Sequence, residues 1–105
     1  MYALHITYTS AVPTADLRDA QVAFAEQLVS VPGFVSKTWL HEGATHGGFY
    51  LFTSREAAQR YLDGPLFARL GAVPVISDVT VRGYAVQDDL GGLTGAERLA
   101  GAATA

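Results

Sequence analysis

Residues 49–56 read Phe-Tyr-Leu-Phe-Thr-Ser-Arg-Glu, and they connect an apolar strand to the start of a helix. The first four residues are apolar or aromatic at every position, which is typical of a strand buried on both faces. The next four have the T-x-x-E spacing of a capping box, in which a hydroxyl and a carboxylate each satisfy a free backbone N–H group. We therefore predict a strand over 49–53, followed by a helix that runs to residue 61 or 62.

The segments on either side extend this alternation of strands and helices. A helix is expected to begin at Thr14, which can cap it, because apolar residues then recur at steps of three and four until Pro32-Gly33. The glycine-rich residues 42–48 indicate a loose hairpin turn. The remaining expected elements are strands over 2–10, 34–41 and 75–86, and a short helical turn over 65–70.

The resulting order, β-α-β-β-α-β, is that of an α+β ferredoxin-like fold with a four-stranded antiparallel sheet and both helices on one face. The opposite face of the sheet would then have no helix to cover it. Strand residues 49–52 are apolar on both sides, and His5 and Thr7 rather than charged residues alternate with the apolar positions of 2–10. A second copy of the same sheet would cover such a face. We therefore predict a homodimer whose sheets pack face to face.

The length of 105 residues suits a single domain. We divide it into a ferredoxin-like domain over 1–87 and a carboxyl-terminal arm over 88–105, where aspartate, glycine and alanine become frequent. The arm is expected to dock partly through Leu90, Leu93 and Leu99, and to fray beyond Ala100.

Composition excludes several classes of function. The net charge is −3 and no basic run occurs, so a nucleic-acid partner is not expected. The chain has no cysteine, which excludes disulfides, thiolate metal sites and cysteine nucleophiles. Apolar stretches are too short for a spanning helix, and residues 1–5 lack the features of a signal peptide, so we expect no membrane association and a cytoplasmic location.

Motifs spread over most of the chain resemble the YdhR-like family, which is classed with monooxygenases of the dimeric α+β barrel superfamily. The most specific pair is P-G-F-x-x-K-x-W, over 32–39, and G-G-F-Y-L-F-T, over 47–53. Further matching segments are Leu4-His5-Ile6, Ala58, Tyr61-Leu62 and the arm-like residues 84–93.

This resemblance implies a dimer made by the sheets and a pocket between sheet and helices. Related barrel enzymes oxygenate polycyclic aromatic compounds without metal or flavin, and other members cyclise polyketides or degrade haem. The first hypothesis is accordingly a cofactor-independent monooxygenase acting on an aromatic or polyketide-like small molecule. The alternatives are a polyketide cyclase or isomerase of the same fold, and a small-molecule-binding dimer without turnover.

Lys37 and Trp39 are the leading catalytic candidates. They are the only lysine and the only tryptophan of the chain, and strand alternation places them on one face. The ammonium of Lys37 could stabilise a phenolate or enolate, and the indole could stack on a flat ligand. The structural alternatives are a lysine whose amine reaches water and a tryptophan that packs in the dimer interface.

His5 is the candidate base, because a neutral imidazole can accept a proton near neutral pH. Thr7 shares its face and could help to bind the substrate. A buried histidine satisfied by a backbone or hydroxyl partner is the alternative.

The other candidate substrate-binding residues are aromatic or charged. Tyr50, Tyr61 and Phe67 could shape a pocket for a planar ligand, although core packing would explain them as well. Asp78 and Arg82 on the last strand could line the mouth of the pocket, or form an ordinary solvated edge.

His41 and His46 flank the expected turn as H-E-G-A-T-H, which suggests a metal site with Glu42. The spacing is not the helical H-E-x-x-H, and structural zinc needs four well-oriented ligands. We therefore predict two exposed turn histidines, no metal and no cofactor.

Overall fold

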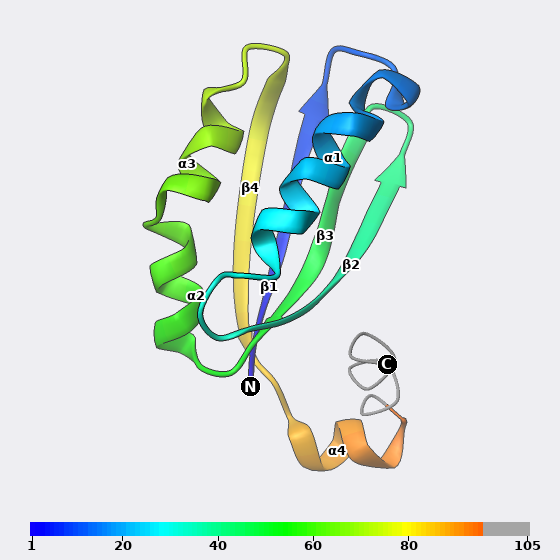
Figure 1. Cartoon of the computed structure of the whole chain (residues 1–105). Coiled ribbons are helices and arrows are strands. Elements are labelled where there is room, and N and C mark those ends of the chain that lie inside the picture. The colour runs from blue at the N-terminus through cyan, green and yellow to red at the C-terminus, as the bar shows by residue number, and fades with distance from the viewer. Residues whose placement is uncertain (96–105) are drawn as a thin grey trace.

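The computed structural model describes residues 1–95 and confirms the predicted order of strands and helices (Figure 1). Its elements are β1 (Tyr2–Ser10), α1 (Thr14–Leu28), β2 (Phe34–Glu42), β3 (Thr45–Phe52), α2 (Arg55–Leu62), α3 (Pro65–Ala72), β4 (Ile76–Ala85) and α4 (Asp88–Leu93).

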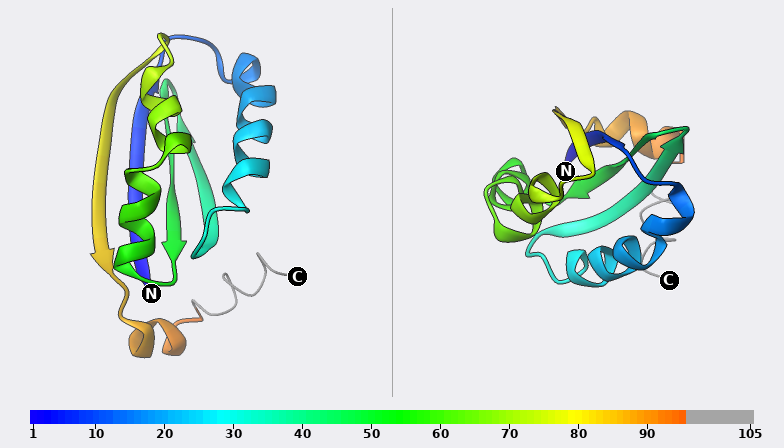
Figure 2. Two further views of the ribbon diagram at one scale, coloured as in Figure 1. Left: turned by 60° about the vertical axis from the view of Figure 1, so that its left-hand side comes forward. Right: turned by 90° about the horizontal axis from the view of Figure 1, so that it is seen from above.

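The four strands form one antiparallel sheet in the order β2-β3-β1-β4. Helices α1, α2 and α3 lie on the same face of this sheet, as the two views of Figure 2 show. We call this the inner face, and the opposite side the outer face. The ferredoxin-like α+β fold predicted from the sequence is thereby confirmed. No helix within residues 1–95 is long and apolar enough to cross a membrane.

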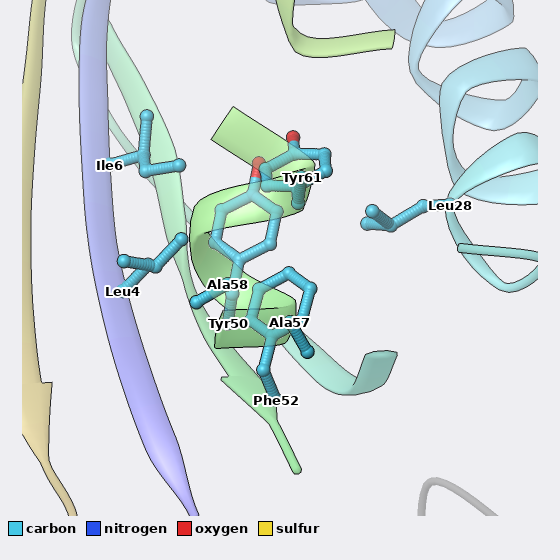
Figure 3. Close-up of a cluster of buried hydrophobic side chains, with 8 residues drawn as sticks. All are labelled: Leu4, Ile6, Leu28, Tyr50, Phe52, Ala57, Ala58 and Tyr61. Atoms are coloured by element: carbon cyan, nitrogen blue, oxygen red, sulfur yellow. The ribbon is translucent and has the colours of Figure 1, made fainter. Parts of the chain in front are cut away.

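The hydrophobic core lies between the centre of the sheet and α2 (Figure 3). Alternation along β1 directs Leu4 and Ile6 inward, where they meet the rings of Tyr50 and Phe52 from β3. Two small residues of α2, Ala57 and Ala58, are each 1% exposed, so this helix packs tightly over the side chains of the sheet. The members from the helices are Ala57, Ala58 and Tyr61 of α2 and Leu28 of α1.

Helix α1 stands away from the sheet over most of its length. Of its apolar stripe only Leu28 is buried, whereas Leu17 and Phe24 are half-buried and Ala20 is exposed. The predicted cap is wrong: Pro13 is the cap residue, and the Thr14 hydroxyl lies 2.9 Å from Nε2 of His41. The stripe faces an open space between α1 and the sheet, which is described below.

The predicted hairpin turn over 42–48 is too long. Strand β3 begins at Thr45, and only Gly43 and Ala44 separate it from β2. Both histidines of this region are consequently strand residues, and the expectation of two exposed turn histidines is wrong for His46, whose side chain is 2% exposed. At the start of α2, Ser54 rather than the expected threonine provides the cap.

The carboxyl-terminal arm is held at its start and not by its leucines. The amino-terminal ammonium lies 3.2 Å from the Asp88 carboxylate, and the Val86 N–H donates to the Met1 carbonyl. Leu90 and Leu93 of α4 are 53% and 85% exposed, so the predicted docking through them is not seen in the single chain. Leu99 and the residues beyond Ala100 lie outside the described residues.

Candidate active site

A cavity of about 290 Å³ lies between the inner face of the sheet and helices α1 and α3. It exists because α1 stands off the sheet, and its lining is mostly aliphatic or aromatic. Its aromatic and cationic lining residues come from five different elements: they are Tyr8, Phe24, Lys37, Trp39, Tyr50 and Arg69. Of the predicted site residues, the structure brings Lys37, Trp39 and Tyr50 together here.

The register of β2 and β3 explains this grouping. Lys37 pairs with Tyr50, and Trp39 pairs with Gly48, so all four positions share the inner face. The Lys37 amine lies 3.4 Å from the ring centre of Trp39 and 4.5 Å from that of Tyr50. It is also 5.2 Å from the ring centre of Phe24 on α1. The faces of aromatic rings carry partial negative charge, so they can hold an ammonium without a formal anion.

Gly48 makes room for the lysine. A Cβ atom at this position would lie 2.7 Å from Cε of Lys37 and 2.6 Å from the Thr38 carbonyl oxygen. Both distances are too short for non-bonded atoms. The aliphatic stem of Lys37 therefore crosses β3 at a residue that has no side chain, and Gly48 is a positioning residue for the amine.

The amine of Lys37 has no anionic neighbour. Among residues 1–95 it takes part in no hydrogen bond or ion pair. Burial disfavours its charged form and lowers the pKa of Lys37 from 10.5 to about 7. Near neutral pH the amine and the ammonium are therefore both populated, which is the condition a proton-transfer group requires.

The tyrosines near the cavity are held neutral. Burial raises the pKa of Tyr8 and Tyr50, and it raises the pKa of Tyr61 to about 12. Tyr61 packs in the core against Phe67, with ring centres 5.6 Å apart, and neither residue lines the cavity. Their predicted role in binding is thus not supported by their position, whereas Tyr50 does reach the cavity.

His5, Thr7 and Arg82 lie on the outer face, away from the cavity. His5 pairs with Phe49 on one side and Arg82 on the other, and its ring stacks on Phe49 with centres 4.5 Å apart. A sheet separates this imidazole from the Lys37 amine. His5 and Lys37 consequently cannot act together on one substrate within a chain, and this part of the sequence-based hypothesis is wrong.

Asp78 is also remote from the cavity. It is exposed, has a φ of 55°, and lies where the register between β1 and β4 shifts. This irregularity is a β-bulge, which breaks the side-chain alternation that would otherwise place Asp78 on the same face as Arg82.

The two histidines of the hairpin form a small cluster next to Tyr8, which lines the cavity. His46 stacks on Tyr8, with ring centres 5.8 Å apart, and lies 5.0 Å from the ring of His41. Burial, with a smaller contribution from His41, lowers the pKa of His46. Within residues 1–95 no group of three or more histidine, cysteine, aspartate or glutamate side chains could hold a metal ion.

Phe24, Gln27 and Arg69 are among the lining residues that were not identified as site residues from the sequence. Phe24 lies on the apolar stripe of α1, which predicted burial but not a cavity. Gln27 is on the same helix, and Arg69 is on α3, where each could equally have been a surface residue. Their position depends on how far α1 stands from the sheet, and no local pattern encodes that distance.

The β-α-β-β-α-β fold of this chain matches solved structures, among them proteins described as oxygenases or antibiotic biosynthesis monooxygenases. The cofactor-independent oxygenase SnoaB from Streptomyces nogalater has a TM-score of 0.67 at 19% identity, with 82% of this chain and 92% of that chain covered. A "putative antibiotic biosynthesis monooxygenase" from Deinococcus radiodurans has a TM-score of 0.65 at 16% identity, with the same coverage. NE2512 from Nitrosomonas europaea, of unknown function, has a TM-score of 0.67 at 21% identity, covering 82% and 89%.

The chain belongs to the YdhR family, since the family model described as "Putative mono-oxygenase ydhR" matches residues 2–97. This confirms the resemblance noted from the sequence motifs. No curated protein matches the sequence.

Proposed function

We propose that the protein is a cofactor-independent monooxygenase that oxidises an electron-rich phenol or enol, with Lys37 as the base. The observation that carries this proposal is the Lys37 amine, which is held among aromatic rings in the cavity wall and has no anionic partner in the described part of the chain. Membership of the YdhR family and the fold shared with SnoaB support the reaction class.

The chemistry follows from the two protonation states of Lys37. The neutral amine takes a proton from an activated CH₂ group or its enol, and the ammonium then pairs with the resulting anion. Burial makes this ion pair stronger than it would be in water. The substrate anion thus forms at neutral pH without a metal or an organic cofactor.

Dioxygen supplies the oxidising power. The anion gives one electron to O₂, and the substrate radical and superoxide combine to form a carbon–oxygen bond. The peroxide takes back the proton from the Lys37 ammonium, and loss of water leaves a carbonyl group. The balance is CH₂ + O₂ → C=O + H₂O, and Lys37 returns to the neutral amine.

The remaining cavity residues orient the substrate. Trp39 and Phe24 meet edge to face, with ring centres 6.4 Å apart, and Tyr50 forms the floor. A planar ligand can stack on such rings, which fixes its reacting carbon relative to the amine. The volume is at the lower end of the range of about 300–1,000 Å³ for small-molecule pockets, which favours a substrate of few rings.

The outer face supports the predicted homodimer. Phe49 and Tyr84 are 48% and 51% exposed there, and Leu40 on the same face is 36% exposed. Exposed aromatic residues on a sheet face are typical of an interface. Phe49→Asp should therefore reduce the mass measured by light scattering from that of a dimer to that of a monomer. An unchanged dimer would contradict this arrangement.

Oxygen uptake tests the proposed reaction. Purified protein treated with chelator is incubated with anthrone, and both O₂ consumption and product mass are followed. We expect anthraquinone and an uptake that Lys37→Met reduces by at least about a hundredfold, since general acid–base catalysis contributes about 10²–10⁴. Arg55→Met is the matched control, because Arg55 is exposed, carries the same charge and does not line the cavity.

Each alternative function has a distinct outcome. A product that has lost water and gained no oxygen would indicate a cyclase. Binding of anthrone without any conversion would indicate a binding protein. Wild-type uptake equal to that of Lys37→Met would remove Lys37 from the mechanism.

A further inference from the structure

We propose that the natural substrate is an aromatic acid, whose carboxylate binds Arg69 at the mouth of the cavity while its ionisable hydroxyl or carbon lies at Lys37. This assignment rests on the proposed function and adds the class of substrate. Three features of the cavity support it.

The first feature is the charge of the lining. Among residues 1–95 the cavity is lined by two cationic side chains, Lys37 and Arg69, and by no aspartate or glutamate. The whole chain has a net charge of −3, so the excess of positive charge is local and opposite to that of the protein. A concave site lined by charges of one sign concentrates ligands of the opposite charge. The lining therefore selects an anion.

The second feature is the present partner of Arg69. Its guanidinium donates a hydrogen bond to Oε1 of Gln27, which is uncharged. Among residues 1–95, Arg69 forms no ion pair. A carboxylate can accept two parallel hydrogen bonds from a guanidinium, and such charged pairs are about twice as strong as neutral ones. An incoming carboxylate would accordingly displace the Gln27 amide.

The third feature is the place of this hydrogen bond. Gln27 lies on α1 and Arg69 on α3, and both line the cavity, so their contact joins the two helices that cover it. Lys37 belongs to the sheet beneath. The two cations thus come from opposite walls of the cavity. A ligand with an ionisable group at one end and a carboxylate at the other would meet both.

Isothermal titration calorimetry with three naphthalene probes tests the assignment. The probes are 6-hydroxy-2-naphthoic acid, its methyl ester and 2-naphthol, which share the ring and the hydroxyl group. We expect the acid to bind wild-type protein at least roughly tenfold more tightly than the ester, the effect of one charged hydrogen bond. Arg69→Gln should abolish this preference, Arg69→Lys should retain part of it, and the control Arg55→Gln should retain all of it.

The outcomes separate this assignment from the proposed reaction. Equal binding of acid and ester, or a preference that survives in Arg69→Gln, would overturn the Arg69 assignment. Lys37-dependent uptake of oxygen with anthrone, which has no carboxylate, would still support the reaction in that case. An acid preference that depends on Arg69, in a protein that consumes no oxygen, would support the binding assignment and overturn the reaction. Binding of none of the probes would overturn the Arg69 assignment, and oxygen uptake with anthrone would still decide the proposed reaction.

Discussion

Replacing Lys37 with methionine should change how the stability of the protein depends on pH. Burial lowers the pKa of Lys37 from 10.5 to about 7, so its charged form is disfavoured in the folded state by about 5 kcal/mol, at about 1.4 kcal/mol per pH unit. Methionine has a similar length and no charge, and it fills the same space between the aromatic rings. The substitution therefore removes the cost of burying a charge while keeping most of the packing.

The sign follows from proton binding. Between pH 7 and pH 10.5 the unfolded chain holds the Lys37 proton and the folded chain does not. The free energy of unfolding of the wild type consequently rises with pH in this window, and Lys37 contributes no change below or above it. From pH 7.5 to pH 9.0 the wild type should gain about 2 kcal/mol relative to Lys37→Met. The tyrosines titrate in both proteins, so their contribution cancels in the difference.

Urea denaturation of both proteins at pH 6, 7.5 and 9.0 measures this difference. Lys37→Met should be the more stable protein at pH 6, and its advantage should shrink as the pH rises. Arg55→Met, which removes an exposed cation, should show no such dependence on pH. A difference in the free energy of unfolding between the wild type and Lys37→Met that is constant across pH 6–9 would mean that Lys37 keeps an ordinary pKa. It would contradict the proposal that Lys37 is the base.

Three further substitutions test the placement of individual residues. His5→Ala should retain oxygen uptake with anthrone, because the imidazole lies across the sheet from Lys37. Loss of uptake in a variant that remains folded would contradict this. Tyr61→Phe should raise the free energy of unfolding by about 1 kcal/mol, because it removes a buried hydroxyl that has no hydrogen-bond partner within residues 1–95. Destabilisation in urea would reveal a hydrogen bond to this hydroxyl. Gly48→Ala should lower the free energy of unfolding by about 2 kcal/mol and reduce uptake, since its methyl group would overlap the Lys37 stem and the Thr38 carbonyl oxygen. Unchanged stability would contradict the close approach of β2 and β3 at this residue.

The order of elements could be predicted from the sequence because local signals mark each boundary. Pro32-Gly33 follows the end of α1, and the serine at residue 54 lies within the predicted helix start. Alternation also placed Lys37 and Trp39 on one strand face. Such signals depend only on neighbours along the chain, so a sequence is sufficient to identify them.

The glycine pair at residues 47 and 48 shows where this reasoning fails. It was interpreted as a turn, although both glycines lie inside β3. A Cβ at Gly47 would lie 2.0 Å from the Ile6 carbonyl oxygen, and one at Gly48 would meet the Lys37 stem. Glycine here allows two segments to approach closely, and a sequence does not distinguish this use from a turn.

The candidate site was predicted only in part for a related reason. Alternation shows which residues share a face, but it does not show which face a helix covers. His5 and Thr7 were therefore grouped correctly with each other and wrongly with Lys37. The distance between α1 and the sheet, which creates the cavity and brings in Arg69, depends on packing between distant segments.

The titration of Lys37 itself is the most direct test of the proposed site. Lys37 is the only lysine, so protein grown with ¹³C-lysine gives a single ε-carbon NMR signal. We expect this signal to titrate near pH 7 in the free protein, and at a higher pH when 2-naphthol is bound, because a naphtholate favours the ammonium. A midpoint near 10.5 that 2-naphthol does not change would show an amine in water, with no role in forming the substrate anion.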